Sequence, residues 1–366
     1  MRVVAFTKYD REAAATRQRF LQYAPFLAQA GFALDYRPLL GDAYVRSLAT
    51  REPWSRGALV GSYVRRIREL LGGAKADLLW VHAELFPYLP FAFERLAFRS
   101  GVPVVYDCDD AYFVRYNDKA GPLFRTAMAG KIERLMERSA AATCGNEHLR
   151  QYVERFCPRS LLFPTVVDID AYKPVEQRRD RLTIGWIGSP STWRNVQPFL
   201  PMLRDICASR NVRFRAVGAG VRAEPDRFEG MELVEWSEER EIAEVQGFDI
   251  GIMPLLDGAF ERGKSGYKLV QYIACGVPAV ASRVGANTTI LRGGCGIFAS
   301  SEADWRTVLE RLIADAELRR ELSEKGRQRA VEEYSLQAYA PKLVALFRDV
   351  TGATGQRAAQ RTSAGA

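Results

Sequence analysis

Two lysines and a glutamine recur at helical spacing in the second half of the sequence. Lys264, Lys268 and Gln271 stand at positions i, i+4 and i+7, so they share one face of an α-helix and its lead-in. The start of a helix attracts anions through its free N–H groups and its dipole, and two lysines there suit a diphosphate. A glutamine one turn later offers hydrogen bonds to sugar hydroxyls. The alternative is a solvated charged face on an ordinary amphipathic helix.

The residues around these side chains predict a strand, a loop, a helix and a second strand. An apolar run at 250–256 is long enough for one buried strand, and a polar loop with glycines follows at 257–266. We expect a helix at 267–275, because Gly276 is a typical helix stop. A second buried strand is expected at 277–282. The loop therefore delivers its cations to the beginning of a helix.

The stretch from Gln271 to Pro278 resembles part of a known motif. It matches the second half of the donor-site motif of retaining glycosyltransferases of the two-domain GT-B type, in the large family 4 group. That motif has a Glu, seven residues, a second Glu, a helix end of small residues and a Pro-Val-Val strand. Here Gly263 stands in place of the first Glu and Gln271 in place of the second. The resemblance therefore implies nucleotide-sugar binding more firmly than it implies catalysis.

The resemblance also implies donor-side roles for residues earlier in the second half. Arg194 matches a basic position that lies against the donor diphosphate in relatives, and Ser189 stands where another Arg often occurs. Small residues in this loop let the backbone approach a phosphate. Trp236 ends a strand that lies near the nucleotide base in relatives. The implied donor-binding residues are Gly188, Ser189, Arg194, Trp236, Lys264, Lys268 and Gln271. Among them, the three cations would stabilise the departing diphosphate, a catalytic role, and the glutamine would hold the ribose.

Three carboxylates in four residues follow a strand expected at 102–106. Asp107, Asp109 and Asp110 lie just past the carboxyl end of that strand, where an open α/β sheet binds ligands. Family members often have a catalytic-site His near this point, and Asp109 aligns roughly with it. We expect these carboxylates near the acceptor, with one as a base for its hydroxyl. A metal site and a charged loop that caps the next helix are the alternatives. The GT-B resemblance implies that no metal is needed at the donor phosphates.

Three further charged residues are candidates for the acceptor side. Arg17 and Arg19 follow the first expected strand, at 2–6, and precede an apolar helix face. A subgroup of the family resembles this chain in carrying Arg pairs here, which implies that they point at the inter-domain cleft; surface arginines are the alternative. Glu84 follows a buried strand expected at 77–82. The acceptor-side candidates are Arg17, Arg19, Glu84, Asp107, Asp109 and Asp110.

Length and composition indicate a globular protein of two domains. The chain has 366 residues, of which 48% are hydrophobic and 26% charged, so each domain can bury its own core. No apolar run is long enough for a transmembrane helix, and the N-terminus does not read as a signal peptide. Six scattered cysteines and only two histidines argue against a zinc site. Reduced, buried thiols in a cytoplasmic protein fit this pattern.

The net charge of +8 favours acidic partners such as nucleotide-sugars or anionic lipid. The excess is spread over both halves and forms no stripe of the kind that binds nucleic acid. Residues 44–75 form the most basic local stretch, with tyrosine and tryptophan interleaved. Such an element can lie on an anionic membrane surface, which predicts a cytoplasmic protein that is peripheral at the inner face of the membrane. The alternative is a helix packed on the sheet with its charges solvated.

The predicted fold is α/β of the GT-B type, with two Rossmann-like domains that face each other across a cleft. We expect an acceptor-side domain at 1–170, a linker at 171–181 and a nucleotide-sugar-binding domain at 182–335. A C-terminal helix at 336–350 is expected to cross back onto the first domain, followed by a disordered tail at 351–366.

The function that the resemblance implies is retaining transfer of a sugar from a nucleotide-sugar to an acceptor hydroxyl. The acceptor would be a glycan or a lipid-linked molecule, in the assembly of cell-surface glycan or glycolipid. No cofactor beyond the donor is expected, and no essential metal. Two alternatives are a nucleotide-sugar epimerase on the same architecture and a non-catalytic nucleotide-sugar-binding partner in a glycan-assembly complex. The departures at Gly263 and Gln271 favour the second of these.

Overall fold

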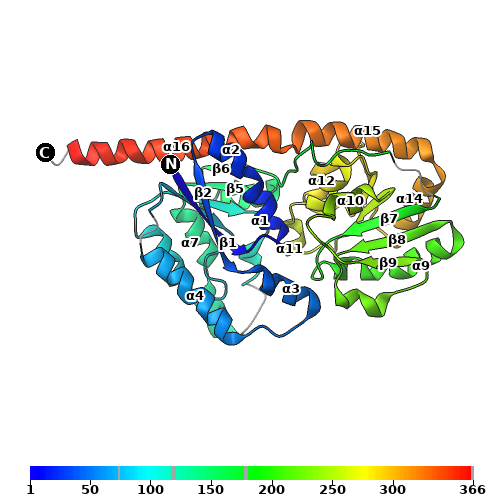
Figure 1. Ribbon diagram of the computed structural model, residues 1–366, viewed down its shortest axis with the longest axis horizontal. Coiled ribbons are helices and arrows are strands. Elements are labelled where there is room, and N and C mark those ends of the chain that lie inside the picture. Colours follow the sequence, from blue (N-terminus) through cyan, green and yellow to red (C-terminus); the bar gives the residue numbers. More distant parts are fainter. Residues whose placement is uncertain (73–74, 117–120, 177–179, 364–366) are drawn as a thin grey trace.

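The protein contains two six-stranded sheets, each with its own helices. The computed structural model describes residues 1–72, 75–116, 121–176 and 180–363, with side chains described through residue 352. All paired strands within the two sheets run parallel. The sheets lie next to each other, and the helices α15 (Ala316–Glu333) and α16 (Leu336–Ser363) extend along both halves (Figure 1).

The first sheet has the strand order β2-β1-β3-β4-β5-β6. Its strands are β1 (Arg2–Tyr9), β2 (Ala33–Leu40), β3 (Leu78–His82), β4 (Val104–Cys108), β5 (Ala141–Cys144) and β6 (Ser160–Leu162). The α-helices of this half are α1 (Ala14–Arg19), α2 (Ala24–Gln29), α3 (Asp42–Thr50), α4 (Arg56–Leu71), α5 (Phe91–Glu94), α6 (Pro122–Met128), α7 (Lys131–Arg138) and α8 (Glu147–Val153). Strands β3 and β4 are buried along their whole length, as expected for a parallel sheet that is covered on both faces.

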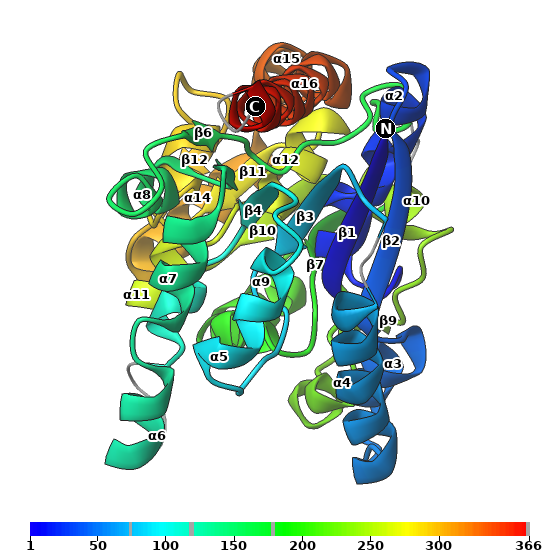
Figure 2. The same cartoon turned by 90° about the vertical axis from the view of Figure 1, so that its left-hand side faces the viewer.

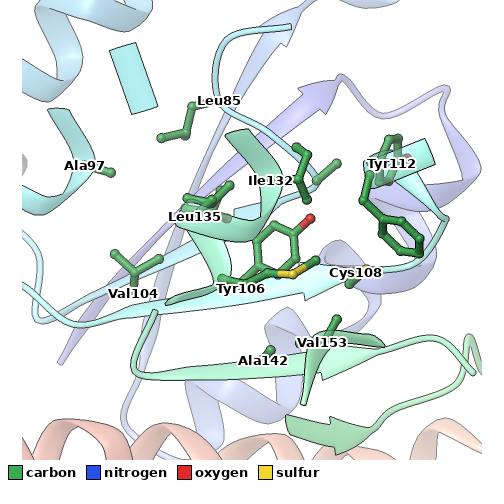
Figure 3. Close-up of a cluster of buried hydrophobic side chains, with 14 of the residues drawn as sticks. Leu85, Ala97, Val104, Tyr106, Cys108, Tyr112, Ile132, Leu135, Ala142 and Val153 are labelled. Carbon is green, nitrogen blue, oxygen red and sulfur yellow. The ribbon is translucent and has the colours of Figure 1, made fainter. Parts of the chain in front are cut away.

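Strand β4 contributes to two separate cores, because successive residues of a strand point to opposite faces. Tyr106 and Cys108 belong to the cluster that also contains Ile132 and Leu135 of α7, and all four are at most 1% exposed (Figure 3). Val105 belongs to the cluster on the other face, which includes residues of α16. This packing fixes the carboxyl end of β4 and therefore the acidic residues that follow it.

The second sheet has the strand order β12-β11-β10-β7-β8-β9. Its strands are β7 (Leu182–Ile187), β8 (Val212–Val217), β9 (Met231–Val234), β10 (Ile250–Met253), β11 (Ala279–Ala281) and β12 (Ile297–Phe298). The other α-helices here are α9 (Leu200–Ser209), α10 (Glu241–Gln246), α11 (Ala259–Arg262), α12 (Tyr267–Ala274), α13 (Asn287–Ile290) and α14 (Glu302–Ala314). The predicted strand–loop–helix–strand unit corresponds to β10, α12 and β11, with the short helix α11 inside the predicted loop.

The last helix packs back onto the first domain, as predicted. Leu343 and Phe347 of α16 are fully buried in the cluster that contains Trp80 of β3, and the Phe347 and Trp80 rings lie 5.2 Å apart between centroids. The helix does not end at residue 350. It continues to Ser363, so that residues 351–363 are helical where a disordered tail at 351–366 was expected; Thr351 is buried, and its hydroxyl donates to the Phe347 carbonyl at 2.8 Å. Residues 364–366 lie outside the described residues.

In sequence, the strands of the first sheet precede the predicted linker at 171–181, and those of the second sheet follow it. Residues 177–179 of this linker lie outside the described part. The first sheet ends with β6 and the second begins with β7. The domain limits themselves stay a prediction. Across the residues that the structure describes, no helix combines the length and apolar character needed to cross a bilayer.

Candidate active site between the two domains

The acidic loop after β4 contacts the loop before α12 across the domain interface. The Lys264 Nζ donates to Asp110 Oδ2 at 2.8 Å, and the Ser265 hydroxyl donates to the Asp109 backbone carbonyl at 2.5 Å. The Asn146 side-chain amide donates to the Lys264 carbonyl at 3.0 Å. Burial raises the pKa of the Asp110 carboxyl above its usual value, since the charge of Lys264 only partly offsets it. The predicted acceptor-side carboxylates and the predicted donor-side lysine thus meet directly.

This close contact explains why residue 263 is a glycine. A Cβ on Gly263 would lie 2.5 Å from the Cβ of Ala111 and 2.8 Å from its backbone nitrogen. Real Cβ atoms do not approach other atoms so closely, so a glutamate here would force the Asp109–Ala111 loop away. The departure from the family motif at this position therefore follows from how the two domains pack.

Lys268 lies near the start of α12 beside the loop that follows β7. Its Nζ is 5.5 Å from the Trp186 ring centroid, and a Cβ on Gly188 would lie 2.8 Å from its Cε. Burial lowers the pKa of Lys268 to about 8, and the charge of Lys264 acts in the same direction. No described side chain forms an ion pair with Lys268. Its charge is thus available to an anion at this helix start, where free N–H groups add to the attraction.

A small cavity opens beside the two lysines. Its volume is about 20 Å³, which holds roughly one water molecule. The lining residues are Trp186, Thr192, Asn195, Met253, Pro254, Leu255, Lys264 and Lys268. A diphosphate needs more room than this, so its entry requires the walls to separate.

Arg194 and Ser189 lie on the same loop system after β7. Arg194 belongs to a short 3-10 helix (Trp193–Asn195), and its guanidinium pairs with Glu261 of α11. The Ser189 backbone N–H donates to the Thr192 hydroxyl at 3.2 Å, which holds the loop in a tight turn. The Arg194 side chain is 62% exposed and can turn toward a ligand at low cost.

Gln271 and Trp236 converge on a residue that the sequence did not single out. The Gln271 amide, 1% exposed, donates to Glu241 Oε1 at 2.9 Å, and the Trp236 indole N–H donates to Glu241 Oε2 at 2.8 Å. Arg17 of the first domain also donates to Oε2, at 2.8 Å, and its guanidinium carbon lies 4.4 Å from the Trp236 ring centroid. From sequence, Glu241 is an ordinary acidic residue in the first turn of α10.

Arg19 and Asp107 form a buried ion pair inside the first domain. The Arg19 guanidinium contacts both carboxylate oxygens and also donates to the Phe163 carbonyl. The Thr143 hydroxyl donates to Asp107 Oδ1 at 2.6 Å. Arg19 is 1% exposed and Asp107 is fully buried. Their hydrogen bonds are therefore directed to the protein interior, and this geometry gives them a role in holding β4 and α1 together.

His82, at the carboxyl end of β3, pairs with Asp109. Its Nε2 lies 2.9 Å from Asp109 Oδ1. Burial alone would lower the pKa of His82, but the charge and hydrogen bond of Asp109 raise it above its ordinary value. Burial acts to raise the pKa of Asp109, and the charge of His82 brings it below its ordinary range. In sequence, Asp109 aligns roughly with a histidine of the family. His82 reaches the same place from β3, and no local pattern in the sequence indicates this.

The remaining acceptor-side candidate, Glu84, is turned into the protein. It accepts from the Lys131 amine at 2.7 Å and from the Tyr116 hydroxyl at 2.5 Å, and its carboxylate is fully buried.

His82, Asp107 and Asp109 are the described residues that could ligate a metal ion, since their ligand atoms lie within 4.8 Å of one another. Because Arg19 and Thr143 already bond to Asp107, a metal there would have to displace them.

The architecture is the GT-B fold, in which two parallel-sheet domains lie next to each other. The structure superposes on sucrose-phosphate synthase from Thermosynechococcus elongatus with a TM-score of 0.73, at 13% identity over 96% of this chain and 99% of that one. It also superposes on WaaG, a glycosyltransferase involved in lipopolysaccharide biosynthesis, with a TM-score of 0.65 at 16% identity over 95% and 99% of the two chains. For HepE from Anabaena, solved with UDP-glucose, the TM-score is 0.65 at 13% identity over 98% and 100%. These likenesses establish the fold.

The sequence itself matches one family model. Residues 181–315 match the model of glycosyl transferases group 1, which covers the second domain through α12 and beyond. The search of curated protein sequences gives no match. The GT-B fold predicted from the sequence is thereby confirmed, and the second domain is similar to glycosyl transferases group 1 over residues 181–315.

Proposed function

We propose that the protein transfers a sugar from a nucleotide-sugar to an acceptor hydroxyl and retains the anomeric configuration. The observation that carries the proposal is the half-buried Lys268, which has no ion-pair partner among the described side chains and lies at the start of α12 beside Lys264. Preorganised cations stabilise charge that develops on a leaving diphosphate. The acceptor would be a glycan or a lipid-linked molecule in the assembly of cell-surface glycan or glycolipid.

Each side of the interface would then have its own role. Lys264 would exchange its bond to Asp110 for one to a phosphate oxygen, and Arg194 would turn from Glu261 toward the same group. The carboxylates of Asp109 and Asp110 would face the acceptor. Because its pKa is held low by His82, Asp109 is a weak base, so its role is to orient and to compensate charge. Protein cations would act on the diphosphate without a metal.

A non-catalytic nucleotide-sugar-binding partner is the second candidate. It is favoured by one observation, the contact of Gly263 with Ala111, which leaves no room for the first glutamate of the family motif. Both candidates predict that the protein binds a nucleotide-sugar, but only the first predicts turnover. One experiment in two stages therefore separates them.

The first stage is a thermal-shift screen with UDP-, GDP- and ADP-sugars. We expect one nucleotide to stabilise the protein clearly above the other two, because a ligand at a hundredfold excess over its Kd contributes about 2.7 kcal/mol. The second stage measures release of nucleoside diphosphate with candidate acceptors. Binding together with acceptor-dependent release supports transfer, and binding without release supports the non-catalytic partner. Failure of all three sugar nucleotides to bind contradicts both.

Helix α4 is the basis for proposing contact with an anionic membrane. Val60, Val64 and Leu71 are 62%, 39% and 55% exposed and lie along one side of the helix. Arg56 and Arg68 flank them and are exposed. In Figure 2, α4 projects from one end of the first domain, as does α6. Of the predicted basic stretch 44–75, residues 73–74 lie outside the described residues. Arg66 is buried and donates to backbone carbonyls, so its charge does not belong to this surface. The location that we propose is the cytoplasmic face of a membrane.

Reversing two of these charges should weaken binding to anionic vesicles. Each basic residue near such a surface contributes about 1 kcal/mol, so replacing Arg56 and Arg68 by Glu should lower partitioning onto phosphatidylglycerol vesicles by at least about 30-fold. Co-sedimentation measures it. The matched control reverses Arg204 and Arg210, which are exposed on α9 and next to it in the second domain. Equal binding by all three proteins would refute the α4 surface.

A further inference from the structure

Glu241 lies at the meeting point of four elements and accepts five hydrogen bonds. Its Oε1 accepts from the hydroxyls of Tyr172 and Tyr267, at 2.7 and 3.0 Å, and from the Gln271 amide at 2.9 Å. Its Oε2 accepts from Trp236 and Arg17, each at 2.8 Å. The residue is 4% exposed. A buried carboxylate with this many directed donors has a fixed position and orientation.

We propose that Glu241 is the carboxylate that binds the donor ribose, in place of the glutamate that the family motif has at position 271. The proposal rests on the proposed function. It assigns to α10 a ribose contact that the sequence assigned to α12.

The identity of residue 271 supports this assignment. A glutamate at 271 would place a second carboxylate at hydrogen-bond distance from Glu241, and two like charges so close in a buried site repel each other strongly. A glutamine there instead donates its amide to Glu241 and holds the carboxylate in place. Gln271 therefore replaces the motif's glutamate because α10 already supplies a carboxylate, Glu241, at this place.

The two oxygens of Glu241 are not equally open to exchange. Oε1 has three partners, all from the second domain or the segment that leads into it. Oε2 has one partner from the second domain, Trp236, and one from the first, Arg17. A ribose hydroxyl that approaches Oε2 would therefore compete with the Arg17 guanidinium, the one donor that comes from the first domain.

Arg17 offers the same contacts that a nucleoside would. Its planar guanidinium lies 4.4 Å from the Trp236 ring centroid and donates to Oε2. A nucleoside presents a planar base that stacks on an aromatic ring, and ribose hydroxyls that donate to a carboxylate. Arg17 is also held by the carbonyls of Arg11 and Glu12, both at 2.9 Å. It is therefore a competitor for the same positions, and the cleft must open on this side for the donor to bind.

The experiment compares each nucleoside diphosphate with its 2′-deoxy form by calorimetric titration, with UDP, GDP and ADP as probes. For the diphosphate that binds, the wild-type protein should prefer the ribose form by about tenfold or more, because its hydroxyl donates to a charged acceptor. Glu241→Gln should reduce this preference to less than about threefold. The double variant Glu241→Gln/Gln271→Glu exchanges the acid and the amide and should restore part of the preference.

Arg17→Ala provides a second, independent readout. Loss of the competing guanidinium should tighten binding of the ribose form at least about threefold and change the deoxy form less. An unchanged ribose preference in Glu241→Gln, or an Arg17→Ala variant that binds the ribose form no more tightly than the wild type, would overturn the assignment while leaving nucleotide binding intact. If none of the three diphosphates binds to the wild-type protein, the proposed function itself fails. Thermal unfolding shows whether each variant folds. If either Glu241→Gln or Arg17→Ala does not fold, the result for the other variant tests the assignment.

Discussion

Replacing Lys268 by alanine should lower kcat/KM for the nucleotide-sugar by about 100- to 1,000-fold. Removing one preorganised group at a developing negative charge typically costs about 2.7 to 4 kcal/mol. Lys268 lies half-buried at the start of α12 and forms no ion pair with another described side chain. Lys264 and Arg194 would contact the diphosphate themselves in the proposed complex, so neither replaces the charge that Lys268 supplies. Steady-state kinetics with the donor identified by the screen measure the effect.

Two variants separate the charge of Lys268 from its packing. Lys268→Arg keeps a cation, and Lys325→Ala removes an exposed lysine that pairs with Glu321 on α15 and should leave kcat/KM unchanged. The pKa of Lys268 is lowered by burial to about 8, so the amine is charged below pH 8 and neutral above it. Donor affinity should therefore fall in the wild type as pH rises through 8, by up to about tenfold per pH unit. It should stay level in Lys268→Arg, and a parallel fall in both proteins would contradict this assignment.

Arg19→Ala should destabilise the protein by about 3 to 5 kcal/mol, because it leaves a buried charge without its partner. Asp107 is fully buried, and after the substitution only the Thr143 hydroxyl would remain among the side chains that bond to it. Urea unfolding at pH 7 measures the change in the free energy of unfolding.

The control for Arg19 is an ion pair of the same chemistry in solvent. Arg11 pairs with Glu238 at 2.7 Å across the domain interface, with side chains 57% and 34% exposed. Arg11→Ala should cost no more than about 1 kcal/mol. A loss below 1 kcal/mol for Arg19→Ala would mean that Asp107 finds other partners, and the structural role assigned to this pair would be wrong.

Local patterns were enough to predict the elements that carry Lys264 and Lys268. The apolar run and the glycine stop around α12 placed that helix to within one residue at its end, since both signals act between near neighbours in sequence. The i, i+4, i+7 spacing likewise identified the lysines. Resemblance to the family then supplied the fold, which the structural comparisons confirm.

Contacts between distant segments could not be predicted in the same way. The Lys264–Asp110 pair joins residues 154 positions apart, and Arg17 reaches Glu241 over 224 positions. Sequence placed both arginines of α1 at the cleft, but the packing directs Arg19 to Asp107 inside the first domain. Glu84 follows the end of a strand, as expected, but its carboxylate forms a buried ion pair with Lys131. Side-chain direction at a loop depends on the whole fold, and single-sequence patterns do not contain it.

Comparing the affinities for a nucleoside diphosphate and its monophosphate tests whether Lys264 and Lys268 hold the donor diphosphate. Calorimetric titration should show that the wild-type protein binds the matching nucleoside diphosphate about 10- to 100-fold more tightly than the monophosphate, because the second phosphate gains charged hydrogen bonds. In Lys268→Ala this preference should shrink at least fivefold. An equal preference for the diphosphate in both proteins, or none in the wild type, would contradict the claim.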